Sequence, residues 1–581
     1  MCSTPVRTDI PPQHGGGTGP PAPAETVRPT LGPSRRGKRF WGQGEPFVWL
    51  SGAALATVLL LTALLIVVVL VNGLGVFWPA AIAQVELADG ETVLGAWVRE
   101  ETNPDTDEET FQLKTGNREF DPQRMDFHWY PKDSIRQVSY PSDVYVLERP
   151  ENGDFFGFLD DVQTPSLELP GEGEPSERFQ AALAEVRREQ ANTIEPIARQ
   201  LSLLNGQLQK IGNKILKLEY RNKRAGAEAD ASLPDDDLAQ LRAEEGEIKA
   251  QSDQLVAEKL AQETALRSNV ALFRTASGEV QEIPLTNIVR WYQPNAMGPA
   301  AKIKHYAAKI WELLADEPRE SNTEGGLFPA IFGTVMLVFL MSIACFPLGV
   351  LAGVYLGEYA REGVLVRMVR IAVNNLAGIP SIVYGIFGLG FFVYGLGGLV
   401  DQWFFPERAA AGVPTYGTGG ILWASMTLGL LTVPVAIVAT EEALRTIPRG
   451  FREGSYALGA TKFQTLWRVL LPMATPGMMT GFILAMARAA GEVAPLMITG
   501  VVKLAPNLPL DGQFPFFHPD RKFMHLGFHI FDIAYQSPNV EASKPMVYVT
   551  TLLLVLIVLV MSGAAIYLRN QMAKRFRSRT I

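Results

Sequence analysis

Apolar and polar residues are distributed unevenly along the 581-residue chain, because long uncharged runs alternate with strongly charged segments. Six runs are long enough to cross the ~30 Å hydrocarbon core of a bilayer as helices. These runs lie at 47–71, 327–356, 373–400, 420–440, 476–502 and 546–568. The pattern predicts a mainly α-helical polytopic membrane protein with six transmembrane helices.

The first apolar run, 47–71, is longer than the hydrophobic part of a signal peptide, and no cleavage site of small residues is obvious. We therefore predict that it is a retained transmembrane helix. Residues 1–46 are rich in Pro and Gly and end close to the basic stretch RRGKR at 35–39. This composition is typical of a disordered tail that lies beside a membrane surface.

Basic residues predict how the spans are oriented. The connections 357–372 and 441–472 and the tail 569–581 together contain 13 Lys or Arg, whereas the loops 401–419 and 503–545 contain five. Loops rich in Lys and Arg stay on the cytoplasmic side. Both termini are therefore predicted to be cytoplasmic, which agrees with an even number of crossings.

Residues 72–326 then lie outside the cytoplasm, and their middle part has a helical pattern. Apolar residues recur at spacings of three and four over 194–218 and, less regularly, over 238–266. Polar residues interrupt the second seam at Glu245, Ser252 and Lys259. With a break at 225–237, the pattern predicts an antiparallel coiled-coil hairpin over about 176–270, whose arms would be roughly 60 Å long.

The sequence on both sides of this hairpin has the character of β-strands. VELADGETVLGAWV (85–98) contains an Asp-Gly turn, and FQLKTGNREF (111–120) and ALFRTASGEVQEIPL (271–285) both read as strand, turn and strand. HWYPKDSIRQV (128–138) and NIVRWYQPN (287–295) also look alike. We predict a small β domain that carries the hairpin. No nucleophile–base set or metal-ligand spacing occurs in its sequence, so a structural or docking role is expected.

Composition and charge exclude several functions. The 52 basic and 60 acidic residues give a net charge of −8, which provides no electrostatic support for binding nucleic acid.

Cys2 and Cys345 are not expected to form a disulfide, because Cys345 lies in an apolar run. The loop 503–545 gathers four polar residues of a kind that bind metals, but surface loops commonly do so, and no metal site is predicted. These residues are His518, Asp520, His525 and His529.

The connection between the fourth and fifth spans contains the most informative motif. It reads EGSYALGATKFQTLWRVLLPMATPG over 453–477, with a glutamate, a glycine six positions later, and Val-Leu-Leu-Pro after nine more residues. Small residues allow a short helix to pack closely in a groove, Gly459 lets the chain turn, and Pro472 restarts a helix. The lysine of a phosphate-binding loop is absent, so the chain itself is not expected to bind nucleotide.

A pair of ionisable residues lies inside the fifth apolar run. Arg488 and Glu492 are four positions apart, which places them on one helical face. Each charge costs ~2.5–3.5 kcal/mol near the membrane centre, so such residues normally face a pathway or the bundle interior. The alternative is a purely structural pair that fixes two helices. We expect a functional role, with Glu492 holding Arg488 until an anion competes for it.

The third apolar run begins with NNLAGIPSIVYGIFGLG, residues 374–390. Asn374, Asn375 and Ser381 could expose polar groups to a pathway at the Gly-Ile-Pro break. Equally, the asparagines could bond neighbouring helices while the small residues allow close packing. The sequence leaves both interpretations open.

Three stretches together resemble the permeases of phosphate ABC importers of the PstA type. They are NNLAGIPSIVYGIFGLG (374–390), TIPRGFREGSYALGATKFQTLWRVLLP (446–472), which contains the EAA-loop pattern, and RAAGEVAPL (488–496). The resemblance covers roughly 320–581 and is weaker for the first span. Residues 72–326 depart from the short loop that is usual in this family, so their role cannot be inferred from it.

The resemblance implies a type I importer permease in a bacterial inner membrane, together with a PstC-like permease, two ATPase subunits and a periplasmic phosphate-binding protein. The chain would then be a transporter subunit and not an enzyme, with no cofactor of its own, because ATP and Mg belong to the partner ATPase. Permeases for sulfate, molybdate or phosphonate remain an alternative, as does a membrane-anchored envelope scaffold or sensor.

The implied site residues form two groups, one for the substrate pathway and one for coupling to the ATPase. The pathway group is Arg488, Glu492, Asn374, Asn375 and Ser381. The coupling group is Glu453, Gly454, Ser455, Ala457, Gly459, Ala460, Leu471 and Pro472. The predicted domains are a disordered basic tail (1–46), a first transmembrane helix (47–71), a periplasmic insertion (72–326), a permease core (327–568) with its coupling loop (441–472), and a basic cytoplasmic tail (569–581).

Overall fold

The structure is a computed structural model, in which the chain divides into two compact units, residues 1–66 and 67–581. The described residues are 45–102, 108–120, 125–167, 173–227, 235–512, 514–537 and 540–577. Almost all of the predicted tail 1–46 therefore lies outside the described residues, as does Cys2.

In the first unit, the described residues all belong to helix α2 (Glu45–Gly75), whose C-terminal end continues into the second unit. The helix is apolar on every side, and large side chains along it are exposed, with Leu55 at 61% and Leu60 at 67%. A helix that is apolar all round is suited to a lipid or buried environment.

Six helices in the described part of the chain are long and apolar enough to cross a membrane, which confirms the six predicted spans. They are Pro46–Gly75, Phe328–Tyr359, Ser381–Phe404, Ile421–Arg445, Lys462–Gly491 and Val540–Lys574. The fold class is therefore confirmed as mainly α-helical and polytopic. The limits of all six spans differ from the prediction by some residues, and two spans differ most: the third begins at Ser381 and not at 373, and the fifth covers 462–491 and not 476–502.

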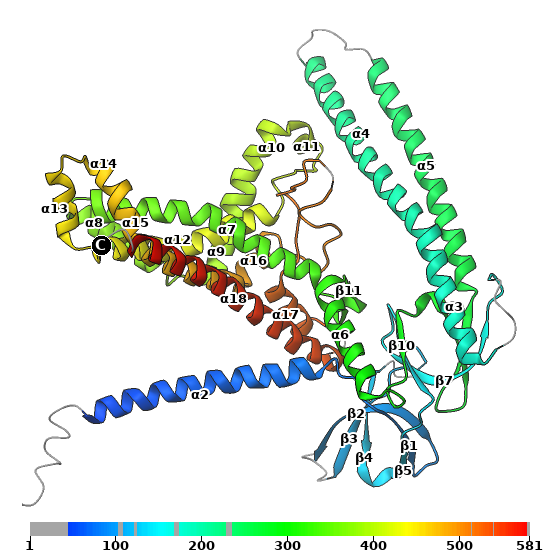
Figure 1. The fold of residues 1–581 in the computed structure, drawn as a ribbon. Coiled ribbons are helices and arrows are strands. Elements are labelled where there is room, and N and C mark those ends of the chain that lie inside the picture. The colour runs from blue at the N-terminus through cyan, green and yellow to red at the C-terminus, as the bar shows by residue number, and fades with distance from the viewer. Residues whose placement is uncertain are drawn as a thin grey trace, which may run out of the picture. The chain divides into compact units, whose positions relative to one another are not determined.

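The helices that build these spans in the second unit pack around α12, which is 67% buried over its most apolar part, against 33% or less for the others. The main helices of this core are α7 (Phe328–Val354), α9 (Ser381–Phe387), α10 (Gly398–Phe404), α12 (Ile421–Arg445), α15 (Leu471–Gly491) and α18 (Val540–Arg577). Figure 1 shows their arrangement.

Glycine allows two of these helices to approach α12 closely. A Cβ atom on Gly349 of α7 would lie 2.4 Å from the Cβ of Ala436, and one on Gly481 of α15 would lie 2.1 Å from the Cβ of Ala439. Small residues of this kind let membrane helices pack backbone against backbone. The contacts fix the position of α15, the helix that carries Arg488.

Residues 82–292 contain two five-stranded antiparallel sheets with the same strand order. The order is β4-β3-β2-β1-β5 in the first sheet and β9-β8-β7-β6-β10 in the second. The strands are β1 (Ile82–Leu87), β2 (Thr92–Thr102), β3 (Glu109–Lys114), β4 (Phe127–Pro131), β5 (Ile135–Ser139), β6 (Val144–Glu148), β7 (Phe155–Gln163), β8 (Val270–Arg274), β9 (Val280–Pro284) and β10 (Arg290–Tyr292). In each sheet a 3₁₀ turn precedes the last strand, at Lys132–Ser134 and Leu285–Asn287.

This repeat accounts for the sequence likeness between 128–138 and 287–295, because both stretches contain the 3₁₀ turn and the strand that follows it. The turn at Asp89-Gly90 is present, with Gly90 at φ 90°, and the strands predicted within 271–285 are β8 and β9. The predicted β region is therefore present and consists of two repeated sheets, which share a hydrophobic cluster that includes Ile82 and Leu94 of the first sheet and Val144 and Phe156 of the second.

The hairpin predicted over 111–120 is wrong. β3 ends at Lys114, and the next residues form a turn in which Asn117 adopts φ 54°. The side chain of Asn117 accepts from the backbone N–H of Phe156 at 2.7 Å and donates to its carbonyl at 3.0 Å. The polar residues that look like a hairpin turn therefore join the first sheet to the second.

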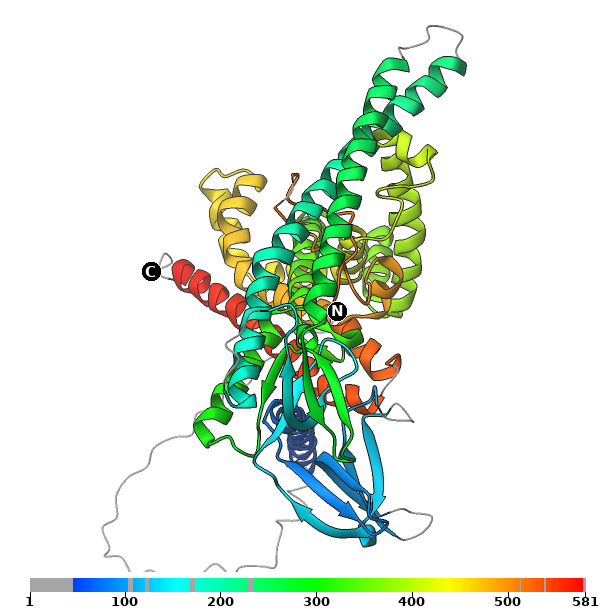
Figure 2. The ribbon, with the colours of Figure 1, turned by 90° about the vertical axis from the view of Figure 1, so that its right-hand side faces the viewer.

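The helical insertion lies between β7 and β8 and consists of α3 (Pro175–Glu189), α4 (Glu195–Ala227) and α5 (Asp235–Arg267). α4 and α5 run side by side in opposite directions, as Figures 1 and 2 show. Ile197, Leu204 and Ile211 of α4 are buried at intervals of seven residues. The predicted helical hairpin is thus present, whereas its classification as a coiled coil stays a prediction.

Candidate functional site

The predicted coupling motif forms a short helix, α13 (Arg449–Ala457), that ends in a defined turn. Gly459 has φ 82°, and its N–H donates to the carbonyl of Tyr456 at 2.9 Å. The N–H of Ala460 donates to the carbonyl of Ser455 at 3.2 Å. This pair of bonds is a Schellman motif, which needs a left-handed residue at the position of Gly459. The turn predicted at Gly459 is present.

Two sets of side-chain contacts hold α13 against the core. The guanidinium of Arg452 bonds the Glu358 carboxylate at 2.5 Å and donates to the carbonyls of Leu444 and Ile447 at 2.8 Å. The hydroxyls of Ser455 and Thr465 lie 2.8 Å apart, which joins α13 to α14 (Lys462–Thr465). A force on α13 would therefore reach the ends of the second, fourth and fifth spans.

The outer face of α13 is unusually apolar for an exposed helix. No residue of α13 is buried, and Phe451, Tyr456 and Leu458 expose 39%, 44% and 91% of their surface. The prediction rested on small residues and missed these three. The sequence did contain a signal for them. Apolar side chains stand between charged ones in this loop, although the loop lies outside the six apolar runs.

The structure places the predicted coupling residues in two locations. Glu453, Gly454, Ala457 and Gly459 are exposed on α13 or its turn, and Ser455 and Ala460 are half-buried. Leu471 and Pro472 instead begin α15. Pro472 follows helical residues 462–470, so it continues a helix that has already started and does not restart one after a loop. Contact of this group with an ATPase stays a prediction.

Arg488 and Glu492 form the predicted pair, although the helix ends between them. α15 stops at Gly491, and Glu492 has the extended values φ −79° and ψ 136°. Its Oε1 lies 3.4 Å from the Nε of Arg488. A second short helix, α16 (Ala494–Thr499), then begins with Pro495 in its first turn. The fifth apolar run is therefore a broken helix, and the polar pair lies at the break.

The charged groups of this pair are only partly shielded within the chain. The Arg488 side chain is 36% exposed and that of Glu492 is 19% exposed. A contact of 3.4 Å is long for a charge-assisted hydrogen bond, which is commonly 2.7–2.9 Å. The guanidinium thus keeps donors available for a second acceptor.

The predicted polar residues of the third span are divided between two helices. Asn374 and Asn375 lie at the end of α8 (Val364–Leu376), and Ser381 begins α9 after Pro380. The hydroxyl of Tyr384 donates to the carbonyl of Leu376 at 2.7 Å across this break. The asparagines therefore precede the third span and do not lie inside it.

The two helix breaks meet where α9 packs on α16. A Cβ on Gly385 of α9 would lie 2.8 Å from the Cα of Pro495, so the two backbones are close. Asn374 lines a cavity of about 600 Å³ together with residues of α12 and with Leu484, which lies one helical turn before Arg488. Within the described ranges, no hydrogen bond joins Arg488 to Asn374, Asn375 or Ser381.

The three histidines of the loop 503–545 serve different partners. His525 caps α17 (Leu526–Tyr535) by accepting from the N–H of Gly527 at 3.1 Å. The Nδ1 of His529 lies 3.3 Å from the Thr550 hydroxyl, and His518 pairs with Asp511 at 3.1 Å. Over the described residues, no group of three or more His, Cys, Asp or Glu could hold a metal ion.

The buried histidines predict a loss of stability in acid. Burial lowers the pKa of His525 to about 3 and that of His529 to about 4, against ~6.5 in an unfolded chain. The folded state therefore binds fewer protons, and this stability is present above pH ~6.5 and is lost as the pH falls. At pH 5 we expect a loss of about 2 kcal/mol per histidine, measured as a lower melting temperature of the detergent-solubilised chain. Replacing both by asparagine should flatten the pH profile; an unchanged slope would contradict the assignment.

Comparison with known proteins identifies the part of the chain that carries these features. Residues 347–574 match the family described as the binding-protein-dependent transport system inner membrane component. The probable phosphate transport system permease protein PstA of Methanocaldococcus jannaschii is 35% identical over 32% of this chain and 60% of its own length. PstA of Mycobacterium leprae is 37% identical over 30% of this chain and 51% of its own length. The chain therefore spans between half and two thirds of the length of these two relatives.

Among solved structures, the inward-facing MetNI methionine ABC transporter matches 46% of this chain and 98% of its own, with 21% identity and a TM-score of 0.31. The probable ABC transporter permease protein YqgI of Bacillus subtilis is 31% identical over 225 residues, which are 38% of this chain and 70% of YqgI. With residues 347–574 matching the family model, the chain belongs to the permeases of binding-protein-dependent ABC transport systems.

Proposed function

We propose that the chain is the permease subunit of an ATP-driven phosphate importer and forms half of its translocation pathway. Two relatives are named as phosphate transport permeases. The observation that carries the proposal is that the matched residues 347–574 contain both the exposed helix α13 and the Arg488–Glu492 pair. As a family member, the chain is a non-enzymatic membrane component, and ATP hydrolysis belongs to a separate subunit.

The proposed assembly contains a PstC-like second permease, two ATPase subunits and a periplasmic phosphate-binding protein. The excess of basic residues in 357–372, 441–472 and 569–581 supports an orientation with α13 and both termini in the cytoplasm of a bacterium. Residues 72–326 are then periplasmic. Apolar Phe451, Tyr456 and Leu458 would fill a groove of the ATPase.

Transport would proceed by alternating access. The loaded binding protein docks on the outer side, and closure of the ATPases moves α13. Because Arg452 ties α13 to Glu358 and Ser455 ties it to Thr465, this movement reaches the spans and opens the pathway outward. Hydrolysis then resets the pair of permeases. ATP supplies the work, since a permease can shift an equilibrium only by its own differential affinity.

Within the pathway, Arg488 would receive the released anion. A guanidinium is planar and carries donors that match the oxygens of a phosphate. Glu492 holds the guanidinium by a long contact, so the arginine is neutralised when the site is empty and can rotate to an anion when one enters. In the proposed assembly, the helix break at Gly491 would let both side chains face the space between the two permeases.

The proposal is tested by transport in vesicles that contain this chain, its partner permease and the ATPase, supplied with the loaded binding protein. We expect ATP-dependent uptake of labelled phosphate that excess sulfate, molybdate or phosphonate does not suppress. Uptake of one of these other oxyanions would contradict phosphate specificity. Absence of any anion-dependent ATPase activity would contradict transport and favour the scaffold or sensor alternative.

A further inference from the structure

A cavity of about 600 Å³ lies away from α13 and Arg488, where the two sheets meet the ends of two spans. Its lining combines the last turn of α2, the first turns of α18, both sheets and the helix α6 (Pro299–Ala315). It also includes the two-residue strand β12 (Glu324–Gly325), which shortly precedes α7.

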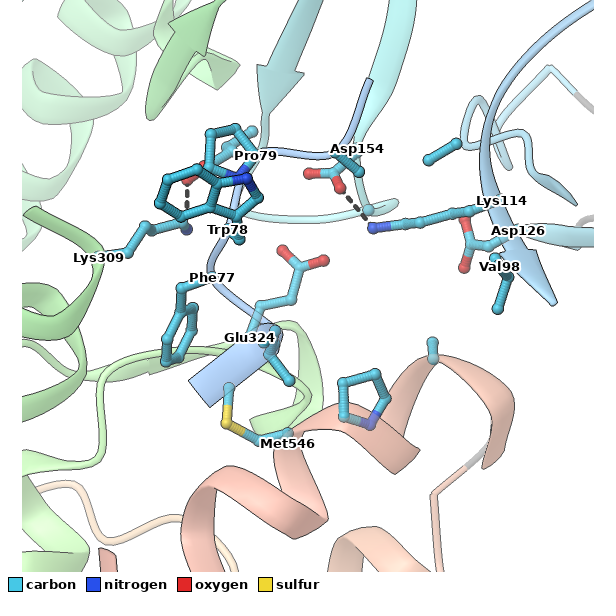
Figure 3. Close-up of a pocket in the computed structure, with 18 of the residues that line it drawn as sticks. Phe77, Trp78, Pro79, Val98, Lys114, Asp126, Asp154, Lys309, Glu324 and Met546 are labelled. Atoms are coloured by element: carbon cyan, nitrogen blue, oxygen red, sulfur yellow. Dashed lines mark hydrogen bonds and ion pairs between the residues drawn. The ribbon is translucent and has the colours of Figure 1, made fainter. Parts of the chain in front are cut away.

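The cavity is lined by apolar residues and by charged residues, and Figure 3 labels several of both kinds. The apolar side is formed at the span ends by Val71, Phe77, Trp78, Met546 and Tyr548. The charged side is formed by the sheets, α6 and β12, with Lys114, Asp154, Lys309 and Glu324 around it. A ligand that fits both sides must itself be amphipathic.

The acidic residues of the lining are paired, with one exception. Asp154 pairs with Lys114, and three further pairs are Asp126 with Arg118, Glu148 with Lys309 at 2.7 Å, and Glu312 with Arg290 at 2.8 Å. The Glu324 carboxylate points into the cavity, and no ion pair or hydrogen bond reaches it from the other residues drawn in Figure 3. Glu324 is therefore the acidic residue of the lining that lacks an ion-pair partner among the described residues.

An unpaired carboxylate in this position is unfavourable. Burial and the nearby Asp154 raise the pKa of Glu324 to about 7, although Lys114 and Lys309 act in the opposite direction. Burying a charge without a partner is costly, and a cation beside the carboxylate would remove most of that cost. Lys114, Lys309 and Lys544 of the lining are already engaged with Asp154, Glu148 and Glu541, respectively. A ligand that carries its own cation would satisfy the Glu324 carboxylate without competing for these lysines.

We propose that this cavity binds the primary ammonium group of a phospholipid headgroup, as in phosphatidylethanolamine, against Glu324. The ammonium would donate to the carboxylate and lie near the rings of Phe77 and Trp78, which attract cations. A lipid is favoured over a soluble amine because the apolar side is built from the ends of two spans, where headgroups and acyl chains meet. Trp78 and Tyr548 are 48% and 38% exposed there, as is typical of residues at the membrane interface.

The proposal is tested on the full chain by native mass spectrometry after reconstitution with phosphatidylethanolamine, with phosphatidylglycerol, or with phosphatidylglycerol plus soluble ethanolamine. We expect one retained phosphatidylethanolamine, no retained phosphatidylglycerol, and at least ~10-fold less retention in Glu324→Gln, since charged hydrogen bonds are worth ~1.5–3 kcal/mol. Glu317→Gln, an exposed carboxylate outside the lining, is the matched control and should retain the lipid.

The proposal would be overturned if Glu324→Gln retained as much phosphatidylethanolamine as the wild type does. It would also be overturned if the chain retained soluble ethanolamine as strongly as it retains the lipid, because the ligand would then be a soluble amine. Thermal stability gives a second readout. In phosphatidylglycerol, Glu324→Gln should be at least as stable as the wild type, because it removes an unpaired charge. Phosphatidylethanolamine should stabilise only the wild type. A variant that is destabilised equally in both lipids would show a purely structural carboxylate and refute the lipid site.

Discussion

Replacing Arg488 with alanine is expected to remove most of the ATP-dependent phosphate uptake while the transporter complex remains assembled. Arg488 is 36% exposed at a helix break and is held by a single long contact to Glu492, so little of the fold depends on it. A charged hydrogen bond is worth about 1.5–3 kcal/mol, and loss of one such contact to the anion corresponds to a roughly 10- to 150-fold lower uptake rate. Uptake of labelled phosphate into reconstituted vesicles measures this.

The matched control for this prediction is Arg569→Ala. Arg569 is half-buried on α18, and its hydrogen bonds to Thr480 and Asn570 are long, at 3.3 and 3.4 Å. Its removal should leave uptake within about twofold of the wild type, because only weak contacts are lost. Arg488→Lys should restore part of the activity, since it keeps the charge and loses the planar fork. Normal uptake by Arg488→Ala would refute a role in the pathway.

Replacing Gly459 with valine is expected to detach the ATPase from the membrane subunits. Gly459 has φ 82°, a conformation that costs an L-residue roughly 1–2 kcal/mol. A Cβ at this position meets no atom within 4 Å, so the effect acts through the backbone and not through a clash. Loss of the turn would displace Leu458 and weaken ATPase docking by roughly 5- to 30-fold. Co-purification of the ATPase with the permease measures the change.

Gly450→Ala serves as the control in the same helix. Gly450 lies in the first turn of α13, and an added Cβ there also meets nothing within 4 Å. Alanine is the better helix former, so this variant should keep the ATPase bound and stabilise α13 by up to ~1 kcal/mol. Should Gly459→Val co-purify with the ATPase as well as Gly450→Ala does, α13 would not be the docking helix.

The spans could be predicted from the sequence because each is a long uncharged run, and all six are present as helices. Their limits could not be predicted from hydropathy, because local breaks set them. Pro380 separates α8 from α9, and the end of α15 at Gly491 leaves 494–499 as a separate helix. Conversely, Lys462 and Arg468 lie in the helical part of the fifth span, although the apolar run begins only at 476.

The β-strands were predictable where a turn joins neighbours in sequence, as at Asp89-Gly90. Their grouping into two sheets was not, because the pairings that separate the sheets are not local. The turn after β3 shows the difficulty. Asn117 has the composition of a hairpin turn, but its side chain bonds Phe156 in the other sheet. Only the contact in three dimensions shows that Asn117 joins the two sheets and does not form a hairpin turn within one sheet.

The candidate site was predictable where the spacing along one helix carries the information. Arg488 and Glu492 are four residues apart and form the predicted contact, but the end of the helix between them could not be predicted from that spacing. The proximity of Asn374 to α15 depends on how three helices pack, which the sequence does not contain in a local form. Glu324 was missed for the same reason, since in sequence it is an ordinary acidic residue before a span.

The pairing of β7 with β8 determines how the long helical arms are attached to the second sheet. Gln163 lies opposite Val270, so the excursion 164–269 leaves and re-enters the sheet at neighbouring strands, about 4.8 Å apart. The long arms α4 and α5 are the part of this excursion that a fluorescent or affinity module could replace. α3 would have to stay, because its Phe179, Leu183 and Val186 belong to the buried core of the second sheet.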